Sequence, residues 1–282
     1  MAATESTGTD AAAIMAPTVT RTSERVLRVL IPIVMLVLAV VVWQSYVVIS
    51  GTPKYILPSP VDVVAALITD WPTLIPSLGT TLTITFEALA LALIGGVGLA
   101  IILVQSKWIE LALFPFAVIL QVTPVVAIAP LLLIYTPNTQ TALLIVAFLV
   151  AFFPILSNMV QGLKSVDHNL LNLFDLYGAG RWQQLIHLKI PASMPYFLTG
   201  LRIGGGLSLI AAVVAEFAAG SAGAGSGLAF RLLESGYRLN MPRLYAALIL
   251  LTFTGVAIFG VTSFITWAVL HRWHESAVRR EN

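Results

Sequence analysis

The sequence contains no cysteine and carries little charge. Of its 282 residues, 10% are Asp, Glu, Lys or Arg, whereas 58% are hydrophobic and the mean hydropathy is +0.94. The absence of cysteine excludes disulfides, thiolate metal sites and cysteine nucleophiles. Soluble domains carry roughly a quarter charged residues, so this chain lacks the polar surface that would keep it in water. We therefore expect a lipid bilayer to surround it.

Further functional classes are excluded by what is missing. The net charge of +2 is small and the basic residues are spread along the chain, which argues against a nucleic-acid partner. The four histidines are scattered without metal-ligand spacing. The sequence has no G-x-x-x-x-G-K-S/T phosphate-binding loop and no Ser/His/Asp or Cys/His arrangement. These absences predict a non-catalytic chain that needs no metal or cofactor and does not itself hydrolyse ATP.

Six apolar stretches reach the length of about 20 residues that a membrane-spanning helix needs. They cover residues 30–49, 80–104, 111–135, 141–161, 196–219 and 244–270. The third stretch contains Pro115, Pro124 and Pro130, so we expect it to be a kinked helix. The fold class predicted is an all-α polytopic membrane protein with six transmembrane helices.

The direction of the chain follows from the basic residues, because cytoplasmic loops carry an excess of Lys and Arg. Of the 15 Lys and Arg residues, ten fall in one set of loops, four in the other and one within a span. The ten are Arg21, Arg25, Arg28, Lys107, Lys164, Arg181, Lys189, Arg272, Arg279 and Arg280, and the four are Lys54, Arg231, Arg238 and Arg243. Both termini are therefore predicted to be cytosolic. We divide the chain into a disordered cytosolic tail (1–25), a transmembrane domain (26–275) and a second cytosolic tail (276–282).

The longest cytosolic loop, residues 163–195, has a pattern of its own. Asp167 is a plausible N-cap, and Gly178 ends the helix that follows as a left-handed glycine would. A second short helix is predicted over 181–189, ending before Pro191, with the chain entering the membrane again at Pro195. The apolar face of the first helix consists of Leu170, Leu173, Phe174 and Tyr177. Lipid headgroups, the protein's own bundle or another protein could each cover this face.

A resemblance favours the last of these alternatives. Gly178, nine further residues and then Leu188-Lys189-Ile190-Pro191 are similar to the cytosolic signature loop of binding-protein-dependent ABC importer permeases. That signature reads Glu-Ala-Ala, three residues, Gly, nine residues, Ile-x-Leu-Pro. The stretches 56–64, 191–206 and 213–217 resemble the nitrate/sulfonate/taurine branch of the same family. The similar segments span about residues 55–250 and follow one another in the family's order.

The resemblance implies a type I ABC importer permease fold in a bacterial inner membrane. It implies a pathway formed by two permease copies, as a homodimer, which two copies of a cytosolic ATP-binding subunit drive. It also implies a periplasmic or lipid-anchored solute-binding protein as a partner. The ATPase-coupling positions by this resemblance are Asn172, Leu173, Phe174, Gly178, Ala179, Gly180, Arg181, Trp182 and Pro191.

The sequence departs from the family at one part of this signature. Asn172, Leu173 and Phe174 stand where Glu-Ala-Ala is usual. Asn can keep a hydrogen bond but not a charge, and the two bulky side chains are expected to widen the packing distance of the helix.

Polar residues inside the spans are candidates for lining or gating the pathway. Glu87 is a candidate for contact with solute, and Arg202 and Glu216 are candidates for structural or gating roles. By helix rise, Glu87 lies about 10 Å below the outer surface and Arg202 about 9 Å above the inner one, so direct pairing is not expected. Gln121 and Thr123 form a polar patch beside Pro124 and are further candidates.

Two other functional classes were considered. A stand-alone secondary transporter or channel predicts related halves with interrupted helices or a series of ionisable groups at the midplane, and neither is evident. A membrane-embedded enzyme requires a cluster of catalytic side chains at one depth, which the spans lack. The solute class implied by the resemblance is a small nutrient, namely a sulfonate, taurine, nitrate or a vitamin- or pyrimidine-like heterocycle.

Overall fold

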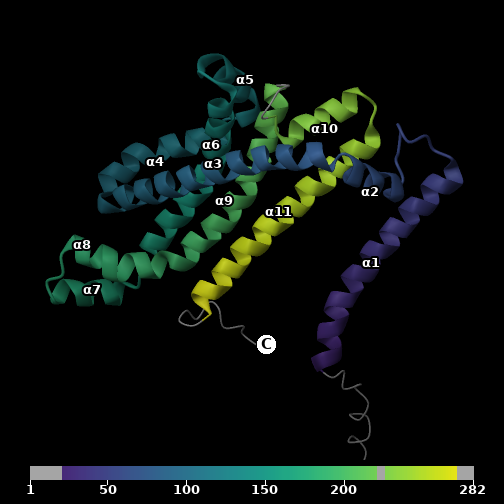
Figure 1. Ribbon diagram of the computed structural model, residues 1–282. Coiled ribbons are helices and arrows are strands. Elements are labelled where there is room, and N and C mark those ends of the chain that lie inside the picture. Colours follow the sequence, from purple (N-terminus) through teal and green to yellow (C-terminus); the bar gives the residue numbers. More distant parts are fainter. Residues whose placement is uncertain (1–20, 221–225, 272–282) are drawn as a thin grey trace, which may run out of the picture.

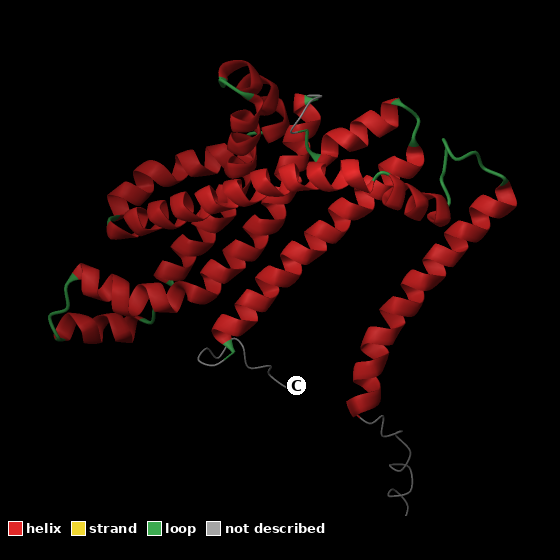
Figure 2. Ribbon diagram, in the orientation of Figure 1, coloured by secondary structure: helices red, strands yellow, loops and turns green. Residues whose placement is uncertain are grey.

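The computed structural model describes residues 21–220 and 226–271, and within these ranges it contains helices and no strands (Figures 1 and 2). The predicted all-α class is confirmed. The helices are α1 (Arg21–Ser50), α2 (Pro60–Thr69), α3 (Trp71–Gln105), α4 (Lys107–Val122), α5 (Val125–Tyr135), α6 (Thr139–Lys164), α7 (His168–Leu176), α8 (Arg181–Gln184), the π-helix η1 (Leu185–Lys189), α9 (Ile190–Ala219), α10 (Leu228–Tyr237) and α11 (Met241–Leu270).

Five of these helices are long and apolar enough to cross a bilayer, and α4 with α5 gives a sixth span if the pair is counted as one. The number of spans therefore equals the predicted six only when this bent pair is counted as one span. Helix α1 begins at Arg21, inside the tail predicted to be disordered up to residue 25. Residues 1–20 and the predicted second tail, 276–282, lie outside the described residues.

The prediction of one kinked helix over 111–135 is wrong. Helices α4 and α5 meet at an angle of 103°, and the break falls at Thr123 and Pro124. Thr123 has φ −67° and ψ 126°, the extended conformation that a following proline favours. Pro115 and Pro130 lie inside α4 and α5 without ending them.

The predicted end of the second loop helix at Pro191 is also wrong. Helix continues without interruption from Arg181 to Ala219, although Pro191 and Pro195 lack the N–H that a regular α-helix uses. The π-helix η1 lies immediately before Pro191, and there the N–H of Ile190 donates to the carbonyl of Leu185. This wider turn accommodates the proline, so the loop helix and the membrane span form one element.

Helix α6 forms the centre of the bundle. Its buried residues Ala151, Ile155 and Leu156 share one hydrophobic cluster with Ala92 and Ala100 of α3. In Figure 1 the helices α3, α6, α9 and α11 run together, whereas α1 stands apart from them. The loop helices α7 and α8 lie at one end of the bundle, and α2 and α10 lie towards the opposite end.

A buried carboxylate joins three helices at the α10 end. Glu216 of α9 is only 3% exposed. One carboxylate oxygen accepts a hydrogen bond from the Thr81 hydroxyl of α3 at 2.8 Å, and the other accepts one from the N–H of Ala229 at 2.9 Å. The Thr81 oxygen in turn accepts the N–H of Leu228 at 2.9 Å. The first turn of α10 is thus held by both residues, because helix N-termini carry unpaired N–H groups.

The lack of a side chain at Gly227 leaves space for the Glu216 carboxylate. A Cβ at Gly227 would overlap the carboxylate of Glu216, so the side chain would have to leave Thr81 and Ala229. The backbone of Gly227 has φ −77°, which any residue adopts, so steric overlap and not backbone strain is what selects glycine there.

Gly227→Ala should therefore destabilise the protein by about 2–4 kcal/mol, because buried donors lose their acceptor. The measurement is thermal unfolding of the purified chain in detergent. Gly206→Ala is the matched control, because a Cβ on Gly206 of α9 meets no atom within 4 Å. The control should change stability by no more than about 1 kcal/mol, with alanine favoured in a helix. Equal effects of the two variants would contradict the assigned role of Gly227.

Candidate functional site

Helix α7 begins and ends as its sequence predicts. The Asp167 carboxylate accepts the N–H of Asn169 at 2.8 Å, which confirms the N-cap. Gly178 has φ +70°, the left-handed conformation in which glycine carries no Cβ penalty. The N–H of Ala179 donates to the carbonyl of Phe174 at 2.9 Å, so the chain turns sharply after the helix.

The turn between α7 and α8 is held by side-chain hydrogen bonds. The Gln184 amide donates to Asp175 at 2.6 Å and to the carbonyl of Ala179 at 3.2 Å. The N–H of Gly180 donates to the Gln183 side chain at 2.8 Å. These bonds connect both ends of the turn, so residues 178–180 form an ordered projection and not a loose loop.

Large apolar side chains surround this projection and remain uncovered. Helix α7 has no buried residue. Leu170 and Leu173 of the predicted apolar face are each 45% exposed and Tyr177 is 84% exposed, whereas Phe174 is half-buried. The exposed set continues with Leu176, Trp182 and Ile186. The bundle therefore does not cover the apolar face of the loop within the described chain.

The remaining predicted coupling residues lie around the same projection. Asn172, Gly178, Gly180 and Arg181 are exposed and Ala179 is half-buried. Pro191 is also half-buried, but it belongs to the first turn of α9 and not to a loop. We use the name loop surface for nine of the exposed residues of α7, the turn and α8, namely Leu170, Asn172, Leu173, Leu176, Tyr177, Gly178, Gly180, Arg181 and Trp182.

An ion pair beside the loop surface was not predicted from the sequence. The Lys164 ammonium at the end of α6 lies 2.5 Å from the Glu110 carboxylate in the first turn of α4. Both residues line a pocket of about 380 Å³ that Leu171 of α7 and Lys189 of η1 also line. The only sequence signal was that Lys107, Glu110 and Lys164 lie at predicted span ends. The pair connects α4 to α6 next to the base of the loop.

The predicted pathway residues do not form one cluster. Arg202 places its guanidinium carbon 5.6 Å from the centre of the Phe259 ring on α11, a cation–π distance. Its Nε is buried and has no hydrogen-bond partner among the described residues. Glu216 is held by Thr81, a residue that the sequence analysis missed.

Two candidates lie on open surfaces. Glu87 is exposed near the middle of α3, and since α3 begins at Trp71 it lies about 24 Å from the start of the helix, at 1.5 Å per residue. Helix α3 begins nine residues before Thr80, the predicted start of the span, and the depth of about 10 Å below the outer surface stays a prediction. Gln121 is exposed at the end of α4, and the Thr123 hydroxyl donates to the carbonyl of Ile119 at 2.6 Å.

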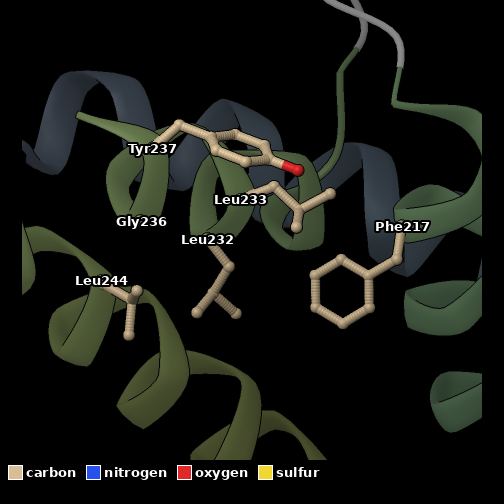
Figure 3. Close-up of a pocket in the computed structure, with 6 residues that line it drawn as sticks. All are labelled: Phe217, Leu232, Leu233, Gly236, Tyr237 and Leu244. Carbon is tan, nitrogen blue, oxygen red and sulfur yellow. The ribbon is translucent and has the colours of Figure 1, made fainter. Parts of the chain in front are cut away.

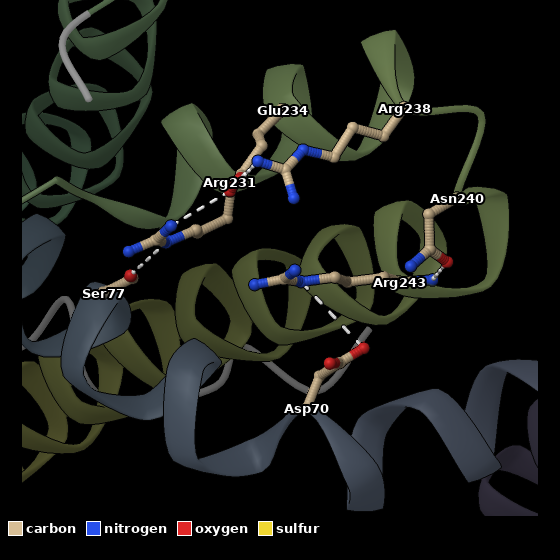
Figure 4. Close-up of polar contacts among 7 residues, drawn as sticks. All are labelled: Asp70, Ser77, Arg231, Glu234, Arg238, Asn240 and Arg243. Carbon is tan, nitrogen blue, oxygen red and sulfur yellow. Dashed lines mark hydrogen bonds and ion pairs between the residues drawn. The ribbon is translucent and has the colours of Figure 1, made fainter. Parts of the chain in front are cut away.

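The opposite end of the bundle carries an ion-pair network (Figure 4). Glu234 of α10 contacts Arg231 and Arg238, each at 3.0 Å. Arg231 also donates to Ser77 of α3 at 3.0 Å, and Arg243 of α11 lies 3.9 Å from Asp70. The hydrogen bond from Arg231 is the main reason that the pKa of Glu234 lies below its ordinary value.

An apolar pocket of about 400 Å³ lies beside the same helix (Figure 3). It is lined by Phe217, Leu232, Leu233, Gly236, Tyr237 and Leu244. Tyr237 is 86% exposed, so α10 presents apolar surface as well as charge at this end. Arg231 and Arg238 belong to the loop that the distribution of basic residues predicts to lie on the outer side of the membrane.

Comparisons with known proteins agree with this arrangement. Residues 92–280 match the family described as binding-protein-dependent transport system inner membrane component. The chain is 32% identical to the riboflavin transport system permease protein RibX of Chloroflexus aurantiacus, over 86% of this chain and 90% of RibX.

Two further relatives carry other solute names. The formylaminopyrimidine transport permease protein ThiX of Halalkalibacterium halodurans is 31% identical, over 80% of this chain and 88% of ThiX. The nitrate import permease protein NrtB of Synechocystis is 30% identical, over 70% of this chain and 75% of NrtB. The chain belongs to the family of binding-protein-dependent transport system inner membrane components and is a permease subunit of an ABC importer.

Proposed function

We propose that the loop surface docks a cytosolic ATP-binding subunit that supplies the energy for import. The observation that carries this proposal is the exposure of Tyr177 and Trp182 on either side of an ordered turn. Exposed aromatic residues next to an exposed arginine, here Arg181, are typical of interface anchors. An exposed apolar cluster of this kind is otherwise costly in water.

The continuous helix from Arg181 to Ala219 supports a mechanical role for this contact. Its 39 residues span about 58 Å at 1.5 Å per residue, and about 53 Å of this length separates Arg181 of the loop surface from Glu216. A displacement of Trp182 when the ATP-binding subunits close would therefore move α9 directly. Glu216 would pass that movement to α10 and α3.

Two copies of the chain, as a homodimer, form the pathway in this proposal, each bound to one ATP-binding subunit. Helix α1 supports a second copy, because its span is only 6% buried within the chain. The excess of Lys and Arg on the loop-surface side supports cytosolic termini and a bacterial inner membrane as the location. The relatives named above come from bacteria.

A periplasmic or lipid-anchored solute-binding protein would meet the opposite end of the bundle. The α10 end offers Arg238 and Tyr237, which are 70% (side chain) and 86% exposed, above the Glu234 network. The solute is a small nutrient of the kind named for the relatives or a sulfonate such as taurine. No observation favours a stand-alone transporter, for which an exposed apolar loop surface would have no role.

Trp182→Ala should reduce the retention of the ATP-binding subunit by about tenfold or more, the effect expected of an interface anchor. Gly178→Ala should weaken retention less, because the left-handed backbone costs alanine about 1–2 kcal/mol. The measurement is the amount of ATP-binding subunit that copurifies with the tagged permease from membranes, together with the ATPase rate of the complex.

Tyr237→Ala is the control for this experiment. It removes an aromatic side chain that is even more exposed than Trp182, 86% against 67%, from the other end of the bundle, so copurification should be unchanged. If the ATP-binding subunit is still retained in full by Trp182→Ala and by a deletion of residues 172–182, the loop surface is not its docking site.

The ion pairs of Glu234 predict a dependence on pH. Because the pKa of Glu234 is lowered in the folded protein, its contribution to stability is complete above the unfolded pKa of about 4.3 and is lost as the pH falls through the folded pKa. Glu234→Gln should therefore lower the unfolding temperature at pH 7, where the pairs contribute about 1 kcal/mol, and its effect should shrink as the pH falls through the folded pKa. Thermal unfolding of both forms from pH 3 to 7 measures this. A difference that does not change with pH would contradict it.

A further inference from the structure

Glu87 is an acidic residue at a position in its helix where contact with lipid would be energetically costly. It lies about 24 Å from one end of α3 and about 27 Å from the other at 1.5 Å per residue, so a hydrocarbon layer about 30 Å thick includes it. Its side chain is exposed and has no hydrogen-bond or ion-pair partner among the described residues. Carboxylates at such depth face a bundle interior or water, because lipid does not solvate them. The face of α3 that carries Glu87 is therefore not a lipid-facing surface.

The neighbours of Glu87 on this face change in character along the helix. Thr83 and Ala90 lie one turn to either side of Glu87 and are also exposed, whereas Leu91 and Ile94, further towards α4, are exposed and apolar. The stripe is thus mixed, and it is the carboxylate of Glu87 that requires water there. Phe253, Val256 and Phe259 of α11 form an exposed stripe of large apolar side chains, so Phe253 serves as a lipid-facing reference.

The other charged groups leave the charge of Glu87 uncompensated. Arg202 does not lie opposite Glu87, because the contacts Thr81–Glu216 and Leu89–Gly205 place Glu87 about two turns further from the loop surface. The Arg202 guanidinium is directed towards Phe259. At the α10 end, each of the described basic residues contacts a carboxylate, and these residues are Lys54, Arg231, Arg238 and Arg243. The route past Glu87 thus offers an acceptor of hydrogen bonds with negative charge.

We propose that Glu87 lines the water-filled translocation pathway and that the solute is a neutral or cationic molecule with N–H donors, not an inorganic anion. This inference rests on the proposed function as an importer permease. A carboxylate accepts hydrogen bonds from ring or exocyclic N–H groups and repels anions. Of the solutes named for the relatives, it favours the nitrogen heterocycles over nitrate.

The absence of cysteine allows a direct test, because each Cys variant carries one thiol. Glu87→Cys in the assembled importer, in membranes, should react with charged, membrane-impermeant methanethiosulfonate reagents. Phe253→Cys, on the apolar face of α11, is the control and should react at least tenfold more slowly. Equally slow reaction at both positions would overturn the proposal. Copurification of the ATP-binding subunit from the same membranes tests the proposed function separately.

The charge of Glu87 is tested at Thr83, one turn away. Thr83→Cys should react faster with the cationic than with the anionic reagent, and adding Glu87→Gln should reduce this ratio about three- to tenfold. An unchanged ratio would show that the carboxylate does not face the reagent path. Cells that carry this importer are expected to show no uptake of labelled nitrate through it. Nitrate uptake that depends on this chain would overturn the proposed class of neutral or cationic solutes.

Discussion

The continuity of the helix from Arg181 to Ala219 is the constraint on which the rest of the structure depends. It makes the loop surface and the Glu216 site two ends of one helix, although two prolines lie between them. The π-helix before Pro191 makes this possible, because its longer hydrogen bond from Ile190 to Leu185 accommodates a residue without an N–H. If the helix ended at Pro191, a force at Trp182 would be absorbed by a flexible joint. With continuous helix, it must move α9.

Glu87 and Glu216 are both acidic residues within spans, but their surroundings in the structure give them different roles. Glu216 is buried and gives both oxygens to fixed donors on α3 and α10, so it acts as a connection between helices. Glu87 is exposed and has no such donors in the described chain. A buried carboxylate whose two oxygens accept hydrogen bonds from the protein holds structure, while an exposed one within a span remains available to water or solute.

What could be predicted from the sequence was local. Hydropathy located the spans, and single residues with strong backbone preferences located the ends of α7, namely Asp167 and Gly178. Three prolines predicted kinks in the third span, but only packing decided that the helix breaks at Pro124. The Thr81–Glu216 hydrogen bond joins residues 135 positions apart, and no local pattern announces such a contact. The same limit applies to Glu110 with Lys164, and to the continuity of helix through Pro191.

Asn172, Leu173 and Phe174, which replace the Glu-Ala-Ala of the family signature, change the chemistry of the exposed loop surface more than the packing of α7. Bulky residues at these positions were expected to widen a helix-packing distance, but α7 buries none of its residues. Leu173 points away from the bundle, being 45% exposed, and Phe174 is half-buried. Compared with Glu-Ala-Ala, these residues therefore add apolar area to the loop surface and remove a negative charge from it. Of the three residues, only Phe174 packs against the bundle. If the loop surface docks an ATP-binding subunit as proposed, that subunit should present an apolar groove to Leu173. Complementarity of this kind would also bias each permease towards its own ATP-binding subunit, because an unpaired charge in the groove would oppose a mismatched pair.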